Sequence, residues 1–350
     1  MQAVAYSLRS SIRARGFSLV EIMVALAVSM LLLAGVIAIF GSSRASYETT
    51  DKLSRIQENG RFAIDQIVRD IRAAGYVGCA RAPTYLSSSL NVAATAQWDF
   101  LDGPVRGFQS IGEDTWTPGL TNVNVTQPSS GSDVLLLRVP RRDAEPLRLT
   151  ADMASGSDSI SVPNVTSGLR AGDIALVYSC EAQSYFQVTS FAGGTIEHTD
   201  DSGLSPGNVT GDIQYAFRKN AEVVPVHTVL YYLRASTADA TTTSLWRRTG
   251  LNSAEELVEG VERMELEFGL DTNGDTVVDD YVTADAVGTN WGNVYSVSVA
   301  LLVRSPEQYG TDLDKRTYRL LSVDVDAPND RYMREVFSAT ANLRNRVPVD

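Results

Sequence analysis

An apolar run from Phe17 to Phe40 constrains what this chain can fold into more than any other stretch of its sequence. It contains one ionisable residue, Glu21. An α-helix rises about 1.5 Å per residue, so a run of this length can cross a bilayer. Three arginines precede the run and no acidic residue lies ahead of Glu21, which predicts a cytoplasmic N-terminus and an exported remainder. The arginines are Arg9, Arg13 and Arg15.

The junction before the apolar run carries a specific motif. It reads Gly-Phe-Ser-Leu-Val-Glu from Gly16 to Glu21, and it resembles the class III signal of type IV prepilins and type II secretion pseudopilins. The resemblance implies that a membrane peptidase cuts between Gly16 and Phe17 and that Phe17 is then N-methylated. An ordinary secretory signal would place its cleavage site after the apolar core.

Glu21 is expected to act in assembly. A carboxylate inside the apolar layer costs roughly 2.5 kcal/mol or more, so an intramembrane acid is a functional hypothesis by default. The resemblance implies that Glu21 pairs with the N-terminal amine of a neighbouring subunit when the helices pack into a filament core. The alternative is a plain signal anchor that carries one acid near its end.

The helix is predicted to continue beyond the membrane to about Ala74, where Gly75 is a natural stop. Gly35, Gly41 and Gly60 are positions at which it could bend or melt in a filament. The predicted domains are a leader (1–16), a long helix (17–75) and a β-rich head (76–350), with the helix divided into a filament core (17–40) and an amphipathic spine (41–75). The apolar stripe of the spine comprises Leu53, Ile56, Phe62, Ala63, Ile67 and Ile71.

The remainder reads as strands and loops, so the predicted fold class is α+β with an antiparallel β-rich head. Residues 80–132 are predicted to be long loops with one or two short strands, and 254–264 could be a helical turn or a strand. Alternating or β-branched segments predict the strands 133–139, 159–162, 173–179, 185–189, 212–217, 226–233, 244–248, 265–270, 295–303 and 336–343.

Several interior segments and the tail resemble the PilW family of minor pilins. The segment Val258–Glu262 is also similar to the J-type pseudopilin of type II secretion, which is the alternative machine. The segments that carry the resemblance are Gly75–Cys79, Tyr178–Glu181, Tyr185–Thr189, Val258–Glu262, Arg334–Ser338 and Leu343–Arg346.

Two cysteines, Cys79 and Cys180, lie beyond the apolar run. In an oxidising compartment a single pair is most simply a disulfide, and it would close a loop of about 100 residues, worth roughly 4.7 kcal/mol in the chain-entropy model. The two histidines, His198 and His227, have no metal-ligand spacing relative to the cysteines.

One acidic loop could hold calcium. Asp271, Asn273, Asp275 and Asp279 occupy positions 1, 3, 5 and 9 of a tight loop, with the carbonyl of Val277 at position 7. The loop lacks the glycine at position 6 and the glutamate at position 12 of an EF-hand. The other interpretation is an acidic hairpin turn without a metal, because Asn-Gly is a strong turn signal.

Enzymatic and nucleic-acid functions are not expected. His198 is predicted to be a solvated surface group and His227 a core or edge residue of a strand, and no hydrolase or nucleotide-binding motif is present. Removing the 16-residue leader takes the formal charge from -12 to -15, which disfavours nucleic-acid binding.

The resemblance implies a non-catalytic minor pilin that primes pilus assembly and sits in a complex at the tip, supporting adhesion and twitching motility. Its implied partners are other minor pilins, the major pilin, the prepilin peptidase, the inner-membrane assembly platform and a calcium-dependent tip adhesin. Before assembly it would be a single-pass inner-membrane protein with a periplasmic head, and afterwards part of the pilus at the cell surface. A membrane-anchored surface-binding module is the alternative from another class.

Overall fold

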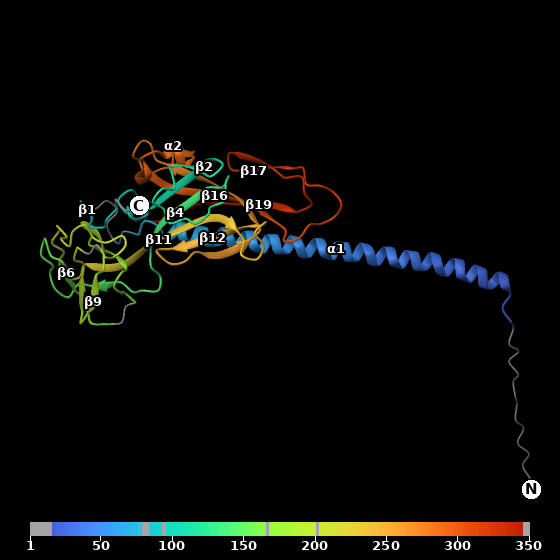
Figure 1. The fold of residues 1–350 in the computed structure, drawn as a ribbon, viewed down its shortest axis with the longest axis horizontal. Coiled ribbons are helices and arrows are strands. Elements are labelled where there is room, and N and C mark those ends of the chain that lie inside the picture. The colour runs from blue at the N-terminus through green and yellow to red at the C-terminus, as the bar shows by residue number, and fades with distance from the viewer. Residues whose placement is uncertain are drawn as a thin grey trace, which may run out of the picture. The chain divides into compact units, whose positions relative to one another are not determined.

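The computed structural model describes residues 16–76, 78, 84–92, 96–165, 168–200 and 203–345. It confirms the predicted fold class, because one long helix, α1 (Leu19–Ala73), precedes a β-rich head (Figure 1). The chain forms two compact units, Met1–Asp51 and Lys52–Asp350, so α1 contributes its last part to the second unit. Besides α1, the described helical segments are short: η1 (Ala96–Trp98), α2 (Ala284–Val287) and η2 (Trp291–Asn293).

The two parts of α1 differ in side-chain exposure. The apolar side chains from Leu19 to Phe40 are exposed, whereas the part from Lys52 onward buries one face in the head. Leu53 and Phe62 were predicted on that face, but they are 37% and 51% exposed. The buried face comprises Ile56, Ala63, Ile64, Ile67, Val68 and Ile71. The helix ends at Ala73, and Gly75 follows in the left-handed region at φ 71°, as its role as a stop predicted.

The largest sheet of the head has the main strand order β1-β8-β7-β11-β4-β2-β3, with β5, β12 and β13 attached beside β11 and β12. Its described pairs are antiparallel except β1 with β8, which is parallel. The strands are β1 (Tyr85–Ser88), β2 (Val105–Gly112), β3 (Thr115–Thr117), β4 (Val134–Pro140), β5 (Leu147–Arg148), β7 (Ile174–Tyr178), β8 (Ala182–Gln187), β11 (Glu222–Ala235), β12 (Thr243–Thr249) and β13 (Glu255–Glu259).

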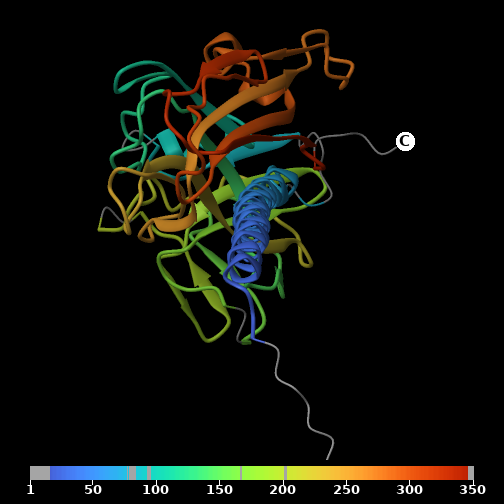
Figure 2. The ribbon, with the colours of Figure 1, turned by 90° about the vertical axis from the view of Figure 1, so that its right-hand side faces the viewer.

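Three smaller sheets complete the head. A four-stranded antiparallel sheet has the order β15-β14-β16-β19, with β15 (Asp280–Val282), β14 (Val261–Leu270), β16 (Val294–Arg304) and β19 (Arg334–Asn342). The order β6-β10-β9 forms a second sheet of β6 (Ser159–Ser161), β10 (Thr195–Glu197) and β9 (Ser190–Ala192). β17 (Thr317–Leu320) pairs with β18 (Val323–Asp326). Figure 2 shows the β6 region, in yellow-green, and the β16–β19 region, in orange and red, at different ends of the head.

The main core joins the end of α1 to both larger sheets. Ile67 and Ile71 of α1 share one buried cluster with Tyr231 of β11 and Val299 of β16. In Figure 1 the labels of β11, β12, β16 and β19 lie beside this last part of α1. Burying an aliphatic side chain contributes about 1.5–3 kcal/mol, so the striped face of the helix stabilises the head as well as covering it.

The structure corrects two of the predictions for the head and resolves a third that was left open. Residues 80–132 contain three described strands, and β2 is eight residues long and lies within the largest sheet. Residues 212–217 form no strand, only an isolated bridge between Ser157 and Ile213. The ambiguous segment 254–264 is extended, and it forms β13 and the start of β14.

Candidate functional site: the N-terminal segment and the head cavity

The start of α1 is built as a capping box. The backbone N–H of Glu21 donates to Ser18 Oγ at 3.2 Å, and the backbone N–H of Ser18 donates to Glu21 Oε2 at 3.3 Å. This reciprocal pair satisfies two of the backbone donors that a helix start leaves unpaired. The sequence analysis read Glu21 only as an assembly residue, although Ser-x-x-Glu before an apolar run is itself a capping signal.

The predicted cleavage site lies directly before this cap. Gly16 and Phe17 precede the helix, and the Phe17 side chain is 80% exposed. The predicted cut between them would therefore leave Ser18, Glu21 and the helix that they cap in the product. Cleavage, methylation and the assembly role of Glu21 remain predictions.

The helix that follows is long and apolar enough to cross a membrane by length and composition. None of its most apolar section is buried within the described chain. Leu26 and Leu33, for example, are both more than half exposed. Such exposure over a continuous stretch requires a non-aqueous environment or a packing partner.

The predicted disulfide is only partly within view. Cys180 follows β7, whereas Cys79 lies outside the described residues. The pairing of the two cysteines therefore stays a prediction.

The acidic loop engages its own backbone. Asp271 is buried, and its carboxylate accepts the backbone N–H groups of Asn273, Gly274 and Thr276 at 2.6–3.1 Å. These bonds lower the pKa of Asp271 against the opposing effect of burial. Asp279 accepts both the N–H and the hydroxyl of Thr272 at 2.7 Å.

These bonds hold the loop in a compact turn, which is compatible with both interpretations. Within the described residues, no group of three or more His, Cys, Asp or Glu side chains is placed to hold a metal ion. Calcium binding by Asp271, Asn273, Asp275 and Asp279 stays a hypothesis.

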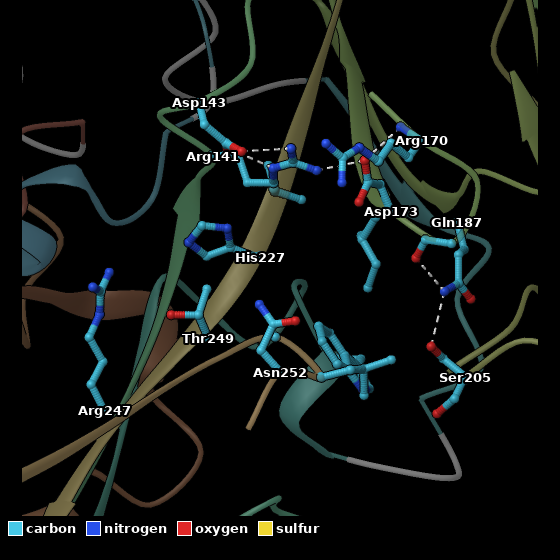
Figure 3. Close-up of a pocket in the computed structure, with 16 residues that line it drawn as sticks. Arg141, Asp143, Arg170, Asp173, Gln187, Ser205, His227, Arg247, Thr249 and Asn252 are labelled. Carbon is cyan, nitrogen blue, oxygen red and sulfur yellow. Dashed lines mark hydrogen bonds and ion pairs between the residues drawn. The ribbon is translucent and has the colours of Figure 1, made fainter. Parts of the chain in front are cut away.

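The head contains a polar cavity of about 530 Å³ between β11, β12 and the loops before β5 and β7 (Figure 3). Arg141 lies between two carboxylates there, bonding Asp143 at 2.9 Å and Asp173 at 2.6 Å. The side-chain bond from the guanidinium lowers the pKa of Asp143. Asp143 is therefore not in the raised-pKa state that a general acid requires.

His227 lines the same cavity, and His198 lies elsewhere. Burial, assisted by the charge of Arg247, lowers the pKa of His227 to about 4, so the imidazole is neutral at pH 7. His198 was predicted to be a solvated surface group, but its side chain is fully buried and its ring packs on Phe186. His198 directly follows β10, and its backbone N–H donates to Asp158 O at 3.0 Å, a long-range contact that local sequence could not reveal.

Comparisons with known proteins match two separate parts of this chain. Residues 12–37 match the sequence model described as the prokaryotic N-terminal methylation motif. Residues 230–345 match the model described as Type IV Pilus-assembly protein W. No curated protein matches the chain. A solved type IV-like pilin from Thermus thermophilus aligns at 12% identity over 86% of this chain and 97% of that one, with a TM-score of 0.30, a superposition too loose to carry weight.

The methylation-motif match, which extends into the exposed apolar helix, is typical of prepilin-type proteins and indicates membrane anchoring. Residues 230–345 are in addition similar to the PilW family of type IV pilin-like minor pilins. This family consists of structural pilins rather than enzymes.

Proposed function

We propose that the protein is a minor pilin of the type IV pilus that primes filament assembly and takes its place in a minor-pilin complex at the tip. The observation that carries the proposal is the N-terminal segment, where an exposed Gly16-Phe17 junction precedes a capped apolar helix with a single acid. The PilW match over β11 to β19 supports the assignment to a pilus. Adhesion and twitching motility are then effects of the filament that it helps to build.

In this proposal Glu21 changes partners during assembly. In the free subunit its carboxylate accepts the N–H of Ser18, a bond of 3.3 Å between exposed groups that is easily exchanged. In a filament core the N-terminal amine of a neighbouring subunit would be a charged and therefore stronger partner. Contacts with the major pilin, the peptidase and the assembly platform belong to the same proposal, as does an inner-membrane location with an exported head.

The decisive experiment is the intact mass and N-terminal sequence of the protein from cells with and without the prepilin peptidase. The expected product begins at N-methylated Phe17 and disappears when the peptidase is absent. A retained leader, or a cut after the apolar run, would contradict the proposal and favour an anchored binding module. Loss of pili rather than of secretion in a deletion strain would separate the pilus from the J-type pseudopilin alternative.

A further inference from the structure

The outer edge of β19 is an open line of backbone hydrogen-bonding groups. Among the described strands, β19 is the last of its sheet and pairs with β16 alone. Leu343 N–H donates to Tyr295 O and Ser305 N–H donates to Met333 O, both at 2.8 Å. These two bonds show which opposing residues of β16 and β19 are hydrogen-bonded to each other. Odd-numbered residues of β19 therefore bond β16, and even-numbered ones present their N–H and C=O groups outward. Within the described chain, the outward backbone N–H groups of Val336, Ser338, Thr340 and Asn342 have no hydrogen-bond acceptor.

This edge lacks the features that normally protect an open strand. From Val336 to Asn342 there is no charged residue, proline or glycine, and the pairing with β16 has no register shift. Natural edge strands are usually short, charged, bulged or interrupted by proline. The other edge strands described here follow that rule, since none exceeds five residues and the longest, β13, is acidic with a register shift beside it.

Half-buried apolar side chains flank the edge on both faces. On one face, Phe337 and Ala339 pack against the core that contains α1. On the other face, Val336 packs against the buried cluster that contains Leu302 of β16 and Leu320 of β17. A strand added along the edge would lay alternate side chains against each of these two groups. The start of the edge is held rigid, because buried Arg334 bonds Glu262 at 2.5 and 2.9 Å and Asp330 at 2.6 and 2.7 Å.

We propose that the outer edge of β19, Val336–Asn342, binds an extended segment from the head of a neighbouring pilin as an added strand. The inference rests on the proposed function, which supplies the neighbour. The segment would be an uncharged stretch of about six residues with apolar or β-branched side chains on both faces, matching the flanks of the edge. Backbone bonds would hold it, and its side chains would provide selectivity.

A second copy pairing through its own β19 is the less suitable occupant. β19 runs in the same direction as the end of α1, since Gly60 faces Phe337 and the Asn345 amide donates to the carbonyls of Ala73 and Ala74 at 3.5 and 3.2 Å. An antiparallel two-fold pair of β19 strands would turn the two helix ends in opposite directions. Subunits anchored in one membrane share one direction, so the geometry favours a different segment of the neighbour.

Hydrogen exchange of the backbone amides tests this proposal directly. The full-length protein in detergent is measured alone and in a cross-linked complex with pilins that mass spectrometry identifies. The expected result is that the amides of Ser338, Thr340 and Asn342 exchange rapidly in the free protein and become protected in the complex. Amides of Ala339 and Ala341 should be protected in both. A complex whose β19 amides exchange as in the free protein would overturn the edge proposal and leave the pilin function intact. Failure to form any complex with pilins would remove the proposed function as well.

Substitutions supply the second test. Ser338→Pro and Thr340→Pro each delete one outward N–H at a position where an edge strand tolerates proline. Ser338→Val and Thr340→Val keep the N–H and are the matched controls. Each proline is expected to weaken association with the neighbouring pilins roughly tenfold, while the valine variants assemble normally. Equal assembly by folded proline and valine variants would refute the proposal, and the exchange measurement remains decisive if a proline variant does not fold.

Discussion

At His227, burial and the nearby Arg247 lower the imidazole pKa from 6.5 to about 4. The unfolded chain therefore binds more protons than the folded head between these pH values. The stability conferred by the neutral ring is present above about 6.5 and is lost as the pH falls toward 4. Asp133 acts in the opposite sense, because burial and Glu265 raise its pKa to about 7, so its contribution decreases as the pH rises from about 4 to 7.

The His227→Gln variant separates these opposing effects. We expect the wild-type protein to lose roughly 2 kcal/mol more than the variant between pH 7 and pH 4, after allowing for the partial exposure of the ring. Urea unfolding of the full-length protein in detergent at several pH values measures the difference. Parallel pH profiles for the two proteins would show that His227 does not titrate in this way.

Asp271 allows the two interpretations of the acidic loop to be distinguished. Asp271→Ala leaves three backbone N–H groups without their acceptor, so we expect a loss of about 2 kcal/mol in unfolding free energy in the presence of a chelator. The control is Asp280→Ala, which removes an exposed carboxylate outside this set of bonds. Calcium should leave the wild-type melting temperature unchanged if the loop is only a turn. A rise with calcium that Asp275→Asn abolishes would establish the metal site instead.

Among the structural elements, α1 packs on the head at a glycine as well as through its apolar side chains. Gly60 was predicted to be a point where the helix could bend, but a Cβ at this position would collide with the Phe337 ring of β19. Gly35 and Gly41 have no such neighbour within 4 Å. Gly60 is therefore a point of close approach between the helix and the edge strand.

Gly60→Ala tests this contact. Alanine favours a helix by about 1 kcal/mol over glycine, but overpacking costs about 1–3 kcal/mol, so we expect a net loss of about 1–2 kcal/mol in head stability. Combining it with Phe337→Ala should cost less than the sum of the two single changes, because the collision is removed. Gly35→Ala serves as the control. Additive single and double variants would contradict a packing role for Gly60.

The strands show which local signals the sequence contains and which it lacks. β16 and β19 were predicted because alternating apolar residues suit a sheet with one buried face. β2 was missed because Gly107 interrupts it, and the structure uses this glycine to admit the Phe268 ring. Residues 212–217 looked like a strand because of their aromatic residues, but Phe217 and Tyr215 pack into a core cluster from irregular chain.

Across the whole molecule, one acid joins the helix to three parts of the head. Asp70 is 2% exposed and accepts Tyr231 Oη–H of β11 at 2.7 Å and the Arg142 guanidinium at 3.0 Å, and it lies 3.3 Å from Arg247 of β12. Helical spacing places Asp70 at the border of the apolar stripe and the exposed Asp65, five residues earlier, on the opposite face, but it does not indicate which residues Asp70 contacts. Long-range partners of this kind are invisible to a local reading, whereas the N-terminal motif is readable because all of its residues are contiguous.

Asp70→Ala should lower the unfolding free energy of the head by about 2–3 kcal/mol, because it removes the carboxylate that accepts the buried Tyr231 hydroxyl and pairs with Arg142 and Arg247. Asp65→Ala is the matched control on the exposed face, with an expected change within about 0.5 kcal/mol. Unfolding of the full-length proteins in guanidinium chloride measures the change in unfolding free energy for both variants. Similar values for the two variants would mean that the Asp70 contacts contribute no net stability.

The position of Asp70 also has a mechanical consequence. If the protein is loaded in a filament, tension on the head reaches the helix along its axis, and the Asp70 contacts lie close to the helix end at Ala73. Bonds from Asp70 to three separate segments would be loaded together in shear rather than opened one after another. The attachment of the helix end to the head would then resist pulling more strongly than the equilibrium free energy of its contacts indicates, because several contacts must rupture at once.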